Sequence, residues 1–304
     1  MECGEILIDE LAGDFDLQST VESGQSYLWD RPDGQMYTES DVHGGTAWYE
    51  TVVSPIHGVT EEPAVVRVRQ HHDRLEWEST TDAVSILTHI LRLDDDLDAI
   101  ERAVPADPMI TRAFDRYPGM RLVRDPAFPS LISFICSAQM RVSRIHGMQR
   151  SLRETYGMAV EMDGQTYYAY PTPESIAART EAELRGLSLG YRAPYIQRTA
   201  EMVAGGEADP RDAASLPYED AREYLTQFVG VGEKVADCVL LFSLGFTEPV
   251  PLDTWIQTAI ADYYPDCACG SYAETSRSIR DRFGGKYAGY VQTYVFHHLR
   301  NGGE

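Results

Sequence analysis

Residues Phe228–Ile256 read FVGVGEKVADCVLLFSLGFTEPVPLDTWI and contain Lys234, one of only two lysines in the chain of 304 residues. Gly230 and Gly232 separate two apolar stretches, and glycine permits positive φ angles and close backbone approach. The segment therefore predicts a helix, a tight turn and a second helix that begins next to Lys234. Free amides at such a helix end attract anions, phosphate among them. A plain turn between two helices explains the glycines equally well.

Lys234 and Asp253 form a candidate chemical pair. A cation in the first turn of a helix opposes the helix dipole, and burial also disfavours its charge, so both effects favour the neutral amine that a nucleophile needs. Asp253 follows Lys234 by nineteen residues and precedes another apolar stretch. One interpretation makes Asp253 a helix N-cap. The other directs its carboxylate back at Lys234 to accept the proton of the amine.

Acidic residues dominate the chain, which has a formal net charge of −22. Such a charge normally disfavours a nucleic-acid partner. Residues 1–105 hold 23 acidic residues and 6 arginines, a net charge of −17, whereas residues 106–304 have a net charge of only −5. An acidic chain that keeps arginine and loses lysine indicates a halophilic protein of a salt-rich cytoplasm. The charge therefore does not exclude DNA as a partner.

The composition is that of an ordinary globular protein, with 43% hydrophobic and 24% charged residues. No run of 18 apolar residues predicts a membrane span, and the acidic start MECGEILIDELAGDFD does not resemble a signal peptide. We therefore expect a cytoplasmic protein. Five cysteines fit a reducing compartment. Cys267 and Cys269 lack two further ligands at metal-site spacing, which favours a loop there.

The pattern predicts an α+β fold with two domains, an N-terminal antiparallel β domain (1–105) and an all-helical domain (106–304). Period-two alternation up to about residue 80 predicts a sheet with one solvated face. The expected elements are a strand, turn and strand over 26–40, strands over 45–53, 64–72 and 74–80, and a helix over 81–93.

Beyond residue 106 the apolar spacing becomes helical, first over 129–157 and then over 172–206. Thr172-Pro173-Glu174 is a helix-start pattern, because a capping hydroxyl precedes a proline and an acidic residue. Leu189-Gly190 is expected to break the second stretch.

Six blocks of the chain, taken in order, resemble the helix-hairpin-helix DNA glycosylases, and specifically the 8-oxoguanine DNA glycosylase/lyases. They read SGQSYLW, DPAFPSLISFICSAQMRVSRIHGM, LSLGYRAPY, GVGEKVADC, VPLDTWI and YAGYVQTYVF. The resemblance implies a base excision repair enzyme that removes oxidised purine (8-oxoguanine) from damaged double-stranded DNA and nicks the strand as an AP lyase. It also implies a monomer without membrane association.

The resemblance assigns the chemistry to Lys234, which attacks the sugar and forms a Schiff base, and to Asp253, which assists the attack and stabilises the oxocarbenium-like charge. The imine then permits β-elimination of the 3′ phosphate. No cofactor for catalysis is implied.

The resemblance places the flipped base between Cys238 and Phe296. Gln292 matches the residue that hydrogen-bonds the base edge. Gly24 matches the residue whose carbonyl accepts the extra N–H of 8-oxoguanine. Without the resemblance, Cys238 and Phe296 are ordinary core residues, Gln292 lies on the surface and Gly24 forms a turn.

Tyr191 and Arg192 match the family's intercalating wedge and an arginine that faces the base opposite the lesion, and Arg144 matches a second such arginine. A Tyr-Arg pair at a helix junction also fits a plain cap. The family hairpin holds a monovalent cation, here potassium or sodium, through backbone carbonyls. The matching carbonyls belong to Thr226, Phe228 and Val231.

Three positions depart from the family pattern. Gln139 stands where the family has the first of several asparagines, which lengthens the amide and weakens the expected preference for cytosine. Trp255 replaces a histidine that contacts phosphate, and is most simply a core residue. Val229 replaces the proline before the hairpin glycine.

Alternative functions remain at this point. An enzyme of the endonuclease III type carries an iron–sulfur cluster that needs four closely spaced cysteines. Only Cys267 and Cys269 follow Cys238, so this type is excluded. A monofunctional alkyl-base glycosylase would lack a lysine at position 234, so the presence of Lys234 argues against this class. A non-catalytic helix-hairpin-helix DNA-binding protein, or a glycosylase for other damaged bases, stays open.

Overall fold

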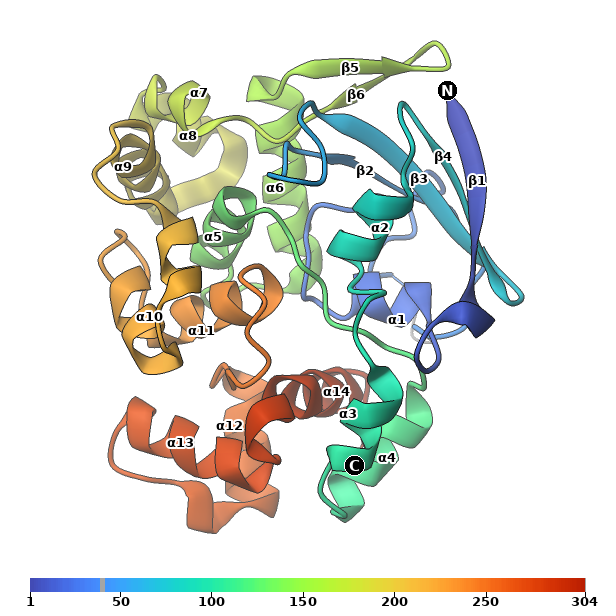
Figure 1. Cartoon of the computed structure of the whole chain (residues 1–304). Coiled ribbons are helices and arrows are strands. Elements are labelled where there is room, and N and C mark those ends of the chain that lie inside the picture. Colours follow the sequence, from blue (N-terminus) through green and yellow to red (C-terminus); the bar gives the residue numbers. More distant parts are fainter. Residues whose placement is uncertain (39–41, 304) are drawn as a thin grey trace.

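The computed structural model describes residues 1–38 and 42–303, and its N-terminal part is built on a four-stranded antiparallel sheet in the order β1-β4-β3-β2 (Figure 1). The strands are β1 (Glu2–Leu7), β2 (Tyr49–Val53), β3 (Ala64–His71) and β4 (Arg74–Ser79). Glu2 pairs with Ser79 between β1 and β4. Tyr49 pairs with Val68 between β2 and β3. The predicted antiparallel sheet is confirmed.

The sheet packs one face on the core because its side chains alternate, and the other face is solvated except where Val65 packs against Met162 and Tyr167. Val66 and Val68 of β3 are fully buried, and helices α1 (Leu17–Glu22) and α2 (Val84–Ile90) complete this core. On the other face Arg67 pairs with Glu78 of the neighbouring strand. The helix predicted over 81–93 is confirmed by α2.

The rest of the chain is helical, apart from one hairpin. Its first helices are α3 (Leu97–Ala103), α4 (Pro108–Arg116), α5 (Ala127–Cys136) and α6 (Val142–Tyr156). The hairpin of β5 (Ala159–Met162) and β6 (Gln165–Tyr168) follows. The remaining helices are α7 (Pro173–Ala177), α8 (Glu181–Leu184), α9 (Ala193–Ala204), α10 (Tyr218–Leu225), α11 (Glu233–Phe242), α12 (Thr254–Tyr263), α13 (Tyr272–Arg282) and α14 (Ala288–Arg300).

Several local predictions hold. Thr172 caps α7 with its side chain, which accepts a hydrogen bond from the amide of Ser175. The helical stretch is broken between α8 and α9, where Ser188 and Gly190 have positive φ. The turn between α10 and α11 separates two helices as expected.

Three details of the fold differ from the prediction. The hairpin β5–β6 interrupts the expected all-helical domain, and α1 interrupts the expected run of strands. The predicted strands over 26–40 are wrong within the described residues, where only Asp30 makes a bridge, to Glu50. Residues 39–40 of that prediction lie outside the described residues. The turn at Pro32 is present, with Gly34 donating to the Arg31 carbonyl.

Three hydrophobic clusters are found among the described residues. One lies under the sheet and includes Leu93, and the largest fills the helical part and also takes in Tyr27 and Leu28. The third is small and joins Val65 of β3 to Tyr167 of β6. Helix α14 is buried along most of its length and lies between α4 and α12 (Figure 1). Within the described ranges, no helix is long and apolar enough to cross a membrane.

Candidate active site

One pocket, of about 50 Å³, collects all residues predicted to act in chemistry and base recognition. They come from the segment after α1, from α11, from the start of α12 and from α14. The pocket lining includes Gly24, Lys234, Cys238, Asp253, Gln292 and Phe296. Four segments far apart in the sequence therefore meet at one place.

Lys234 is the second residue of α11, whose N-cap is Gly232. Its half-buried side chain reaches across to the end of α5. The Nζ atom donates a hydrogen bond to the Ser137 hydroxyl at 3.1 Å and lies 5.6 Å from the centre of the Phe134 ring. Sequence reasoning did not identify Ser137 or Phe134 as neighbours of Lys234.

Asp253 is the N-cap of α12, and its Oδ1 atom accepts a hydrogen bond from the Ile256 amide at 2.8 Å. Burial raises the pKa of Asp253 above its usual value, against the opposing effects of that amide and of the Lys234 charge. A carboxylate has several acceptor positions. The N-cap interpretation is therefore confirmed, and it leaves acceptor capacity that can serve Lys234.

Two further pocket residues are almost fully buried. Cys238 lies one helical turn after Lys234 and is 3% exposed, and burial raises the pKa of its thiol to about 11. Gln292 is 4% exposed, and its Nε2 atom donates to the Thr293 hydroxyl at 3.0 Å. The alternative that places Gln292 on the surface is wrong. Phe296 is half-buried and stands one turn after Gln292 on α14.

Gly24 needs to be glycine in this conformation. Its φ is +91°, and a Cβ atom would lie 3.0 Å from Arg300 Nη1 and 3.2 Å from Val142 Cγ1. Arg300 also donates to the Ser23 carbonyl at 2.8 Å, and its guanidinium lies 5.6 Å from the centre of the Phe296 ring. Sequence reasoning missed Arg300, although its spacing of four residues from Phe296 puts both on one face of a helix.

The loop over 137–141, between α5 and α6, connects the pocket to the residues predicted to contact the opposite base. Gln139 is exposed with a φ of 56°. Arg192 donates to the Ala138 carbonyl and is only 2% exposed. Tyr191 is 54% exposed. Arg144 is exposed in the first turn of α6.

The hairpin between α10 and α11 uses its two glycines differently. Gly230 has a φ of +86°, and a Cβ atom there would approach the Tyr195 side chain to 2.9 Å. Gly232 has an extended backbone, and a Cβ atom would meet nothing within 4 Å. The rings of Tyr191 and Tyr195 are 6.1 Å apart, so the predicted wedge is linked to the hairpin.

The carbonyls proposed for a monovalent cation lie in this same turn. The Phe228 carbonyl accepts from the Val231 amide at 3.1 Å. Within residues 1–38 and 42–303, no hydrogen bond reaches the carbonyls of Thr226 and Val231. A carbonyl oxygen has two lone pairs, so this set fits the demand of a hard cation for oxygen ligands.

Two other predictions can be compared with the structure. Trp255 is 39% exposed at the start of α12, so its placement in the core is wrong. Cys267 ends a short turn and Cys269 lies in the following loop, and both thiols are free. Among the residues that the structure describes, no cluster of three or more His, Cys, Asp or Glu side chains is arranged to hold a metal ion.

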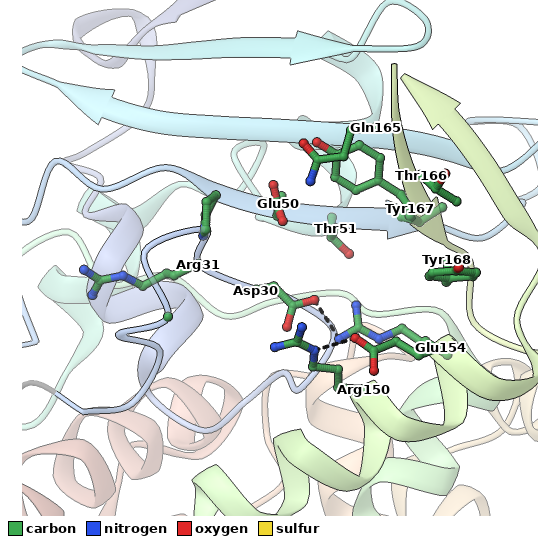
Figure 2. Close-up of a pocket in the computed structure, with 14 residues that line it drawn as sticks. Asp30, Arg31, Glu50, Thr51, Arg150, Glu154, Gln165, Thr166, Tyr167 and Tyr168 are labelled. Carbon is green, nitrogen blue, oxygen red and sulfur yellow. Dashed lines mark hydrogen bonds and ion pairs between the residues drawn. The ribbon is translucent and has the colours of Figure 1, made fainter. Parts of the chain in front are cut away.

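A larger pocket, of about 350 Å³, lies between β2, α6 and the β5–β6 hairpin (Figure 2). Its charged residues are paired with other side chains. Asp30 binds Arg153 at 2.9 Å, and Arg150 binds Glu154 at 2.7 Å. Glu50 lies 3.8 Å from Arg67. None of the predicted site residues lines this pocket.

Two family models together match most of the chain. The model of HhH-GPD superfamily base excision DNA repair proteins matches residues 132–283. The model of the 8-oxoguanine DNA glycosylase N-terminal domain matches residues 7–131.

Two curated relatives also match most of the chain. The chain is 30% identical over 314 residues to "Probable N-glycosylase/DNA lyase" of Methanothermobacter thermautotrophicus, with 96% of this chain and 95% of that protein covered. It is 32% identical over 272 residues to N-glycosylase/DNA lyase of Saccharomyces cerevisiae, with 81% of this chain and 68% of that protein covered.

Solved structures of Clostridium acetobutylicum 8-oxoguanine glycosylase/lyase share the fold. The apo-form has a TM-score of 0.80 at 26% identity, covering 94% of this chain and 93% of that chain. The complex with double-stranded DNA containing cytosine opposite 8-oxoguanine has a TM-score of 0.81 at 25% identity, covering 99% and 98%.

Proposed function

Because the chain belongs to the HhH-GPD superfamily of base excision DNA repair proteins, we propose that it is a bifunctional DNA glycosylase and AP lyase that excises 8-oxoguanine from duplex DNA. The observation that carries this proposal is the single pocket that unites Lys234, Asp253 and the four predicted base-binding residues. N-glycosylase/DNA lyase relatives along nearly the whole chain support the same activity.

Lys234 is the nucleophile of this mechanism. Its neutral amine attacks C1′ of the deoxyribose, the new C–N bond replaces the glycosidic C–N bond, and the base leaves with the bonding electrons. Asp253 accepts the proton released from the amine and stabilises positive charge that develops on the sugar. Collapse to the Schiff base acidifies the hydrogen at C2′, and β-elimination then breaks the C3′–O bond.

Base recognition requires the pocket to widen. Its volume of about 50 Å³ is well below the roughly 300–1,000 Å³ of typical ligand pockets. Phe296 and Cys238 both line the pocket, and Phe296 is only half-buried, so a displacement of Phe296 admits the base. Gln292 then binds the base edge, and the Gly24 carbonyl accepts the N7–H of 8-oxoguanine.

Residues around the loop over 137–141 read the opposite strand. Tyr191 fills the gap left by the flipped base, and Arg144 donates to the base opposite the lesion. Arg192 must leave the Ala138 carbonyl to do the same. Gln139 is exposed between them. The amides at the start of α11, behind Gly230 and Gly232, bind a phosphate.

We also propose that the turn holds potassium or sodium through the carbonyls of Thr226, Phe228 and Val231, where the cation would offset phosphate charge. The enzyme acts as a monomer on damaged duplex DNA at the nucleoid. We propose the division at residue 105, although the hydrophobic clusters change earlier in the chain, between Leu93 and Leu97.

The direct test uses duplexes that carry 8-oxoguanine opposite each of the four bases, in buffers from low salt to molar KCl. We expect base release, strand nicking, and a covalent protein–DNA adduct when borohydride is added. Intact strands after alkaline treatment would overturn the proposed glycosylase activity. Nicking confined to duplexes with another damaged base would favour a glycosylase of different lesion range.

A further inference from the structure

One tyrosine hydroxyl connects the two segments that carry Lys234 and Asp253. The Leu252 amide donates a hydrogen bond to the Tyr272 hydroxyl at 3.2 Å. That hydroxyl in turn donates to Asp237 Oδ2 at 2.8 Å. Leu252 directly precedes Asp253, and Asp237 follows Lys234 by three residues on α11. Tyr272 therefore joins the backbone next to the carboxylate to the helix that bears the amine.

The acceptor of this bridge is firmly held. Asp237 has no exposed surface, and its other oxygen accepts from the Tyr218 hydroxyl at 2.8 Å. Arg222 Nη1 lies 3.9 Å from the Oδ2 atom. Burial raises the pKa of Asp237 to about 7, against the opposing effects of Arg222, Tyr272 and Tyr218. A buried carboxyl with several partners is a rigid anchor, because the remaining partners hold it in place when one of them is lost.

The segment that ends at Asp253 is held at the same point on its other side. The Leu252 carbonyl accepts from Gln257 Nε2 at 3.1 Å, so both backbone polar groups of Leu252 are bound. Displacing a reacting group by about 1 Å can cost a factor of roughly 10² in rate. The bridge through Tyr272 thus limits displacements of Asp253 relative to Lys234, and such displacements would lower the excision rate.

We propose that Tyr272 is a positioning residue for base excision, whose hydroxyl fixes Asp253 relative to Lys234 by bridging Leu252 and Asp237. This inference rests on the proposed glycosylase function. Tyr272 lies outside the lining of the active-site pocket, so it acts through Asp253 and not on the DNA.

The first test compares two substitutions that each remove one hydrogen bond from Asp237. Tyr272→Phe keeps the ring and removes the bridge to Leu252, and should slow single-turnover excision about tenfold while the dissociation constant for lesion DNA stays within about twofold. Tyr218→Phe, the matched control, removes the other tyrosine hydrogen bond and should keep the wild-type excision rate. Equal slowing by both substitutions, or by neither, would overturn the proposal.

A double-mutant cycle gives a readout that a merely structural role would not move. In an Asp253→Asn background, Tyr272→Phe should have no further effect on the excision rate, because the group it positions is already gone. A tenfold effect that persists in that background would overturn the positioning role. Wild-type protein without activity on 8-oxoguanine duplexes would remove the proposed function itself, whereas active wild type with an equally active Tyr272→Phe would overturn only this inference.

Discussion

The two pockets contain buried carboxylates whose pKa values move in opposite directions. Burial alone would raise the pKa of Asp30 in the larger pocket, but Arg153 and His146 outweigh it and hold that pKa at about 2. In the smaller pocket, burial dominates and raises the pKa of Asp253, although Lys234 acts against it. The difference lies in the partners, because the Arg153 guanidinium and the His146 imidazole both contact Asp30.

This contrast teaches that pocket volume is a poor guide to the site of chemistry. In the larger pocket the charged side chains are paired with one another or with neighbouring residues. Such pairing is expected where the pocket is a structural junction between β2, α6 and the β5–β6 hairpin (Figure 2). The smaller pocket holds an amine bound to a hydroxyl and a carboxylate bound to backbone amides. Those groups remain able to exchange protons, which acid–base catalysis requires.

The largest expected effect comes from Asp253→Asn. Asparagine is an equally good N-cap, so α12 keeps its start while the proton acceptor is lost. Excision should slow by a factor of about 10²–10³ in single-turnover assays, with little change in affinity for lesion DNA. Asp96→Asn makes the same exchange at the N-cap of α3 and should leave excision unchanged. An excision rate close to wild type in Asp253→Asn would instead support a role limited to capping.

Phe296→Ala should weaken binding to an 8-oxoguanine duplex by about 1–3 kcal/mol, the usual value for one base stacked on an aromatic ring. Binding to a duplex with an abasic site should change little, because no base is then available to stack. Fluorescence titrations with both duplexes check this. If cleavage at abasic sites falls as much as excision of 8-oxoguanine, Phe296 supports the fold and does not contact the base.

Asp30→Asn tests the charge-paired pocket. Because the folded-state pKa of Asp30 is about 2, below the usual 3.9 of an unfolded chain, its contribution is present above about pH 4 and is lost as pH falls towards 2. The substitution should cost about 2 kcal/mol of unfolding free energy at pH 7 and abolish this part of the pH dependence. Urea unfolding between pH 2 and 7 measures both. If Asp30→Asn instead has normal stability but excises more slowly, the larger pocket takes part in the chemistry and the contrast between the two pockets is wrong.

The smallest effect is expected at Gln139, where the longer amide sits less well against cytosine. Wild type should accept cytosine but also process 8-oxoguanine opposite other bases. Gln139→Asn should sharpen the preference for cytosine about tenfold, or about 1.4 kcal/mol. The residue has a φ of 56°, which asparagine tolerates better than most side chains, so the fold should survive. Wild type that already prefers cytosine about a hundredfold would contradict this prediction.

Much of the architecture could be predicted because local patterns and ordered motifs agree with it. Strands β2, β3 and β4, the helix–turn–helix around Gly230 and the N-cap at Asp253 follow from side-chain period and capping chemistry, whereas β1 was not predicted. The structure of residues 26–38 could not be predicted, because the alternation in that segment has another cause. Trp29 packs under the sheet while its neighbours Tyr27 and Leu28 pack in the helical core, so the chain passes between two clusters without forming a strand.

The site was predictable in its members but not in its contacts. Motif spacing identifies Lys234, yet nothing in the spacing shows that it meets Ser137, which lies 97 residues earlier. The same holds for the hydroxyl of Tyr272 next to Leu252. Trp255 was misplaced because a large apolar ring is usually buried, whereas the first turn of α12 leaves it exposed.

The central claim is that Lys234 is the covalent nucleophile, and reductive trapping tests it most directly. Wild type, Lys234→Gln and Lys286→Gln are each incubated with an 8-oxoguanine duplex and borohydride, and the adduct is mapped by peptide mass spectrometry. Wild type and Lys286→Gln should form an adduct at Lys234, and Lys234→Gln should form none. An adduct mapped to Lys286 or to the N-terminal amine, or undiminished trapping in Lys234→Gln, would contradict the claim.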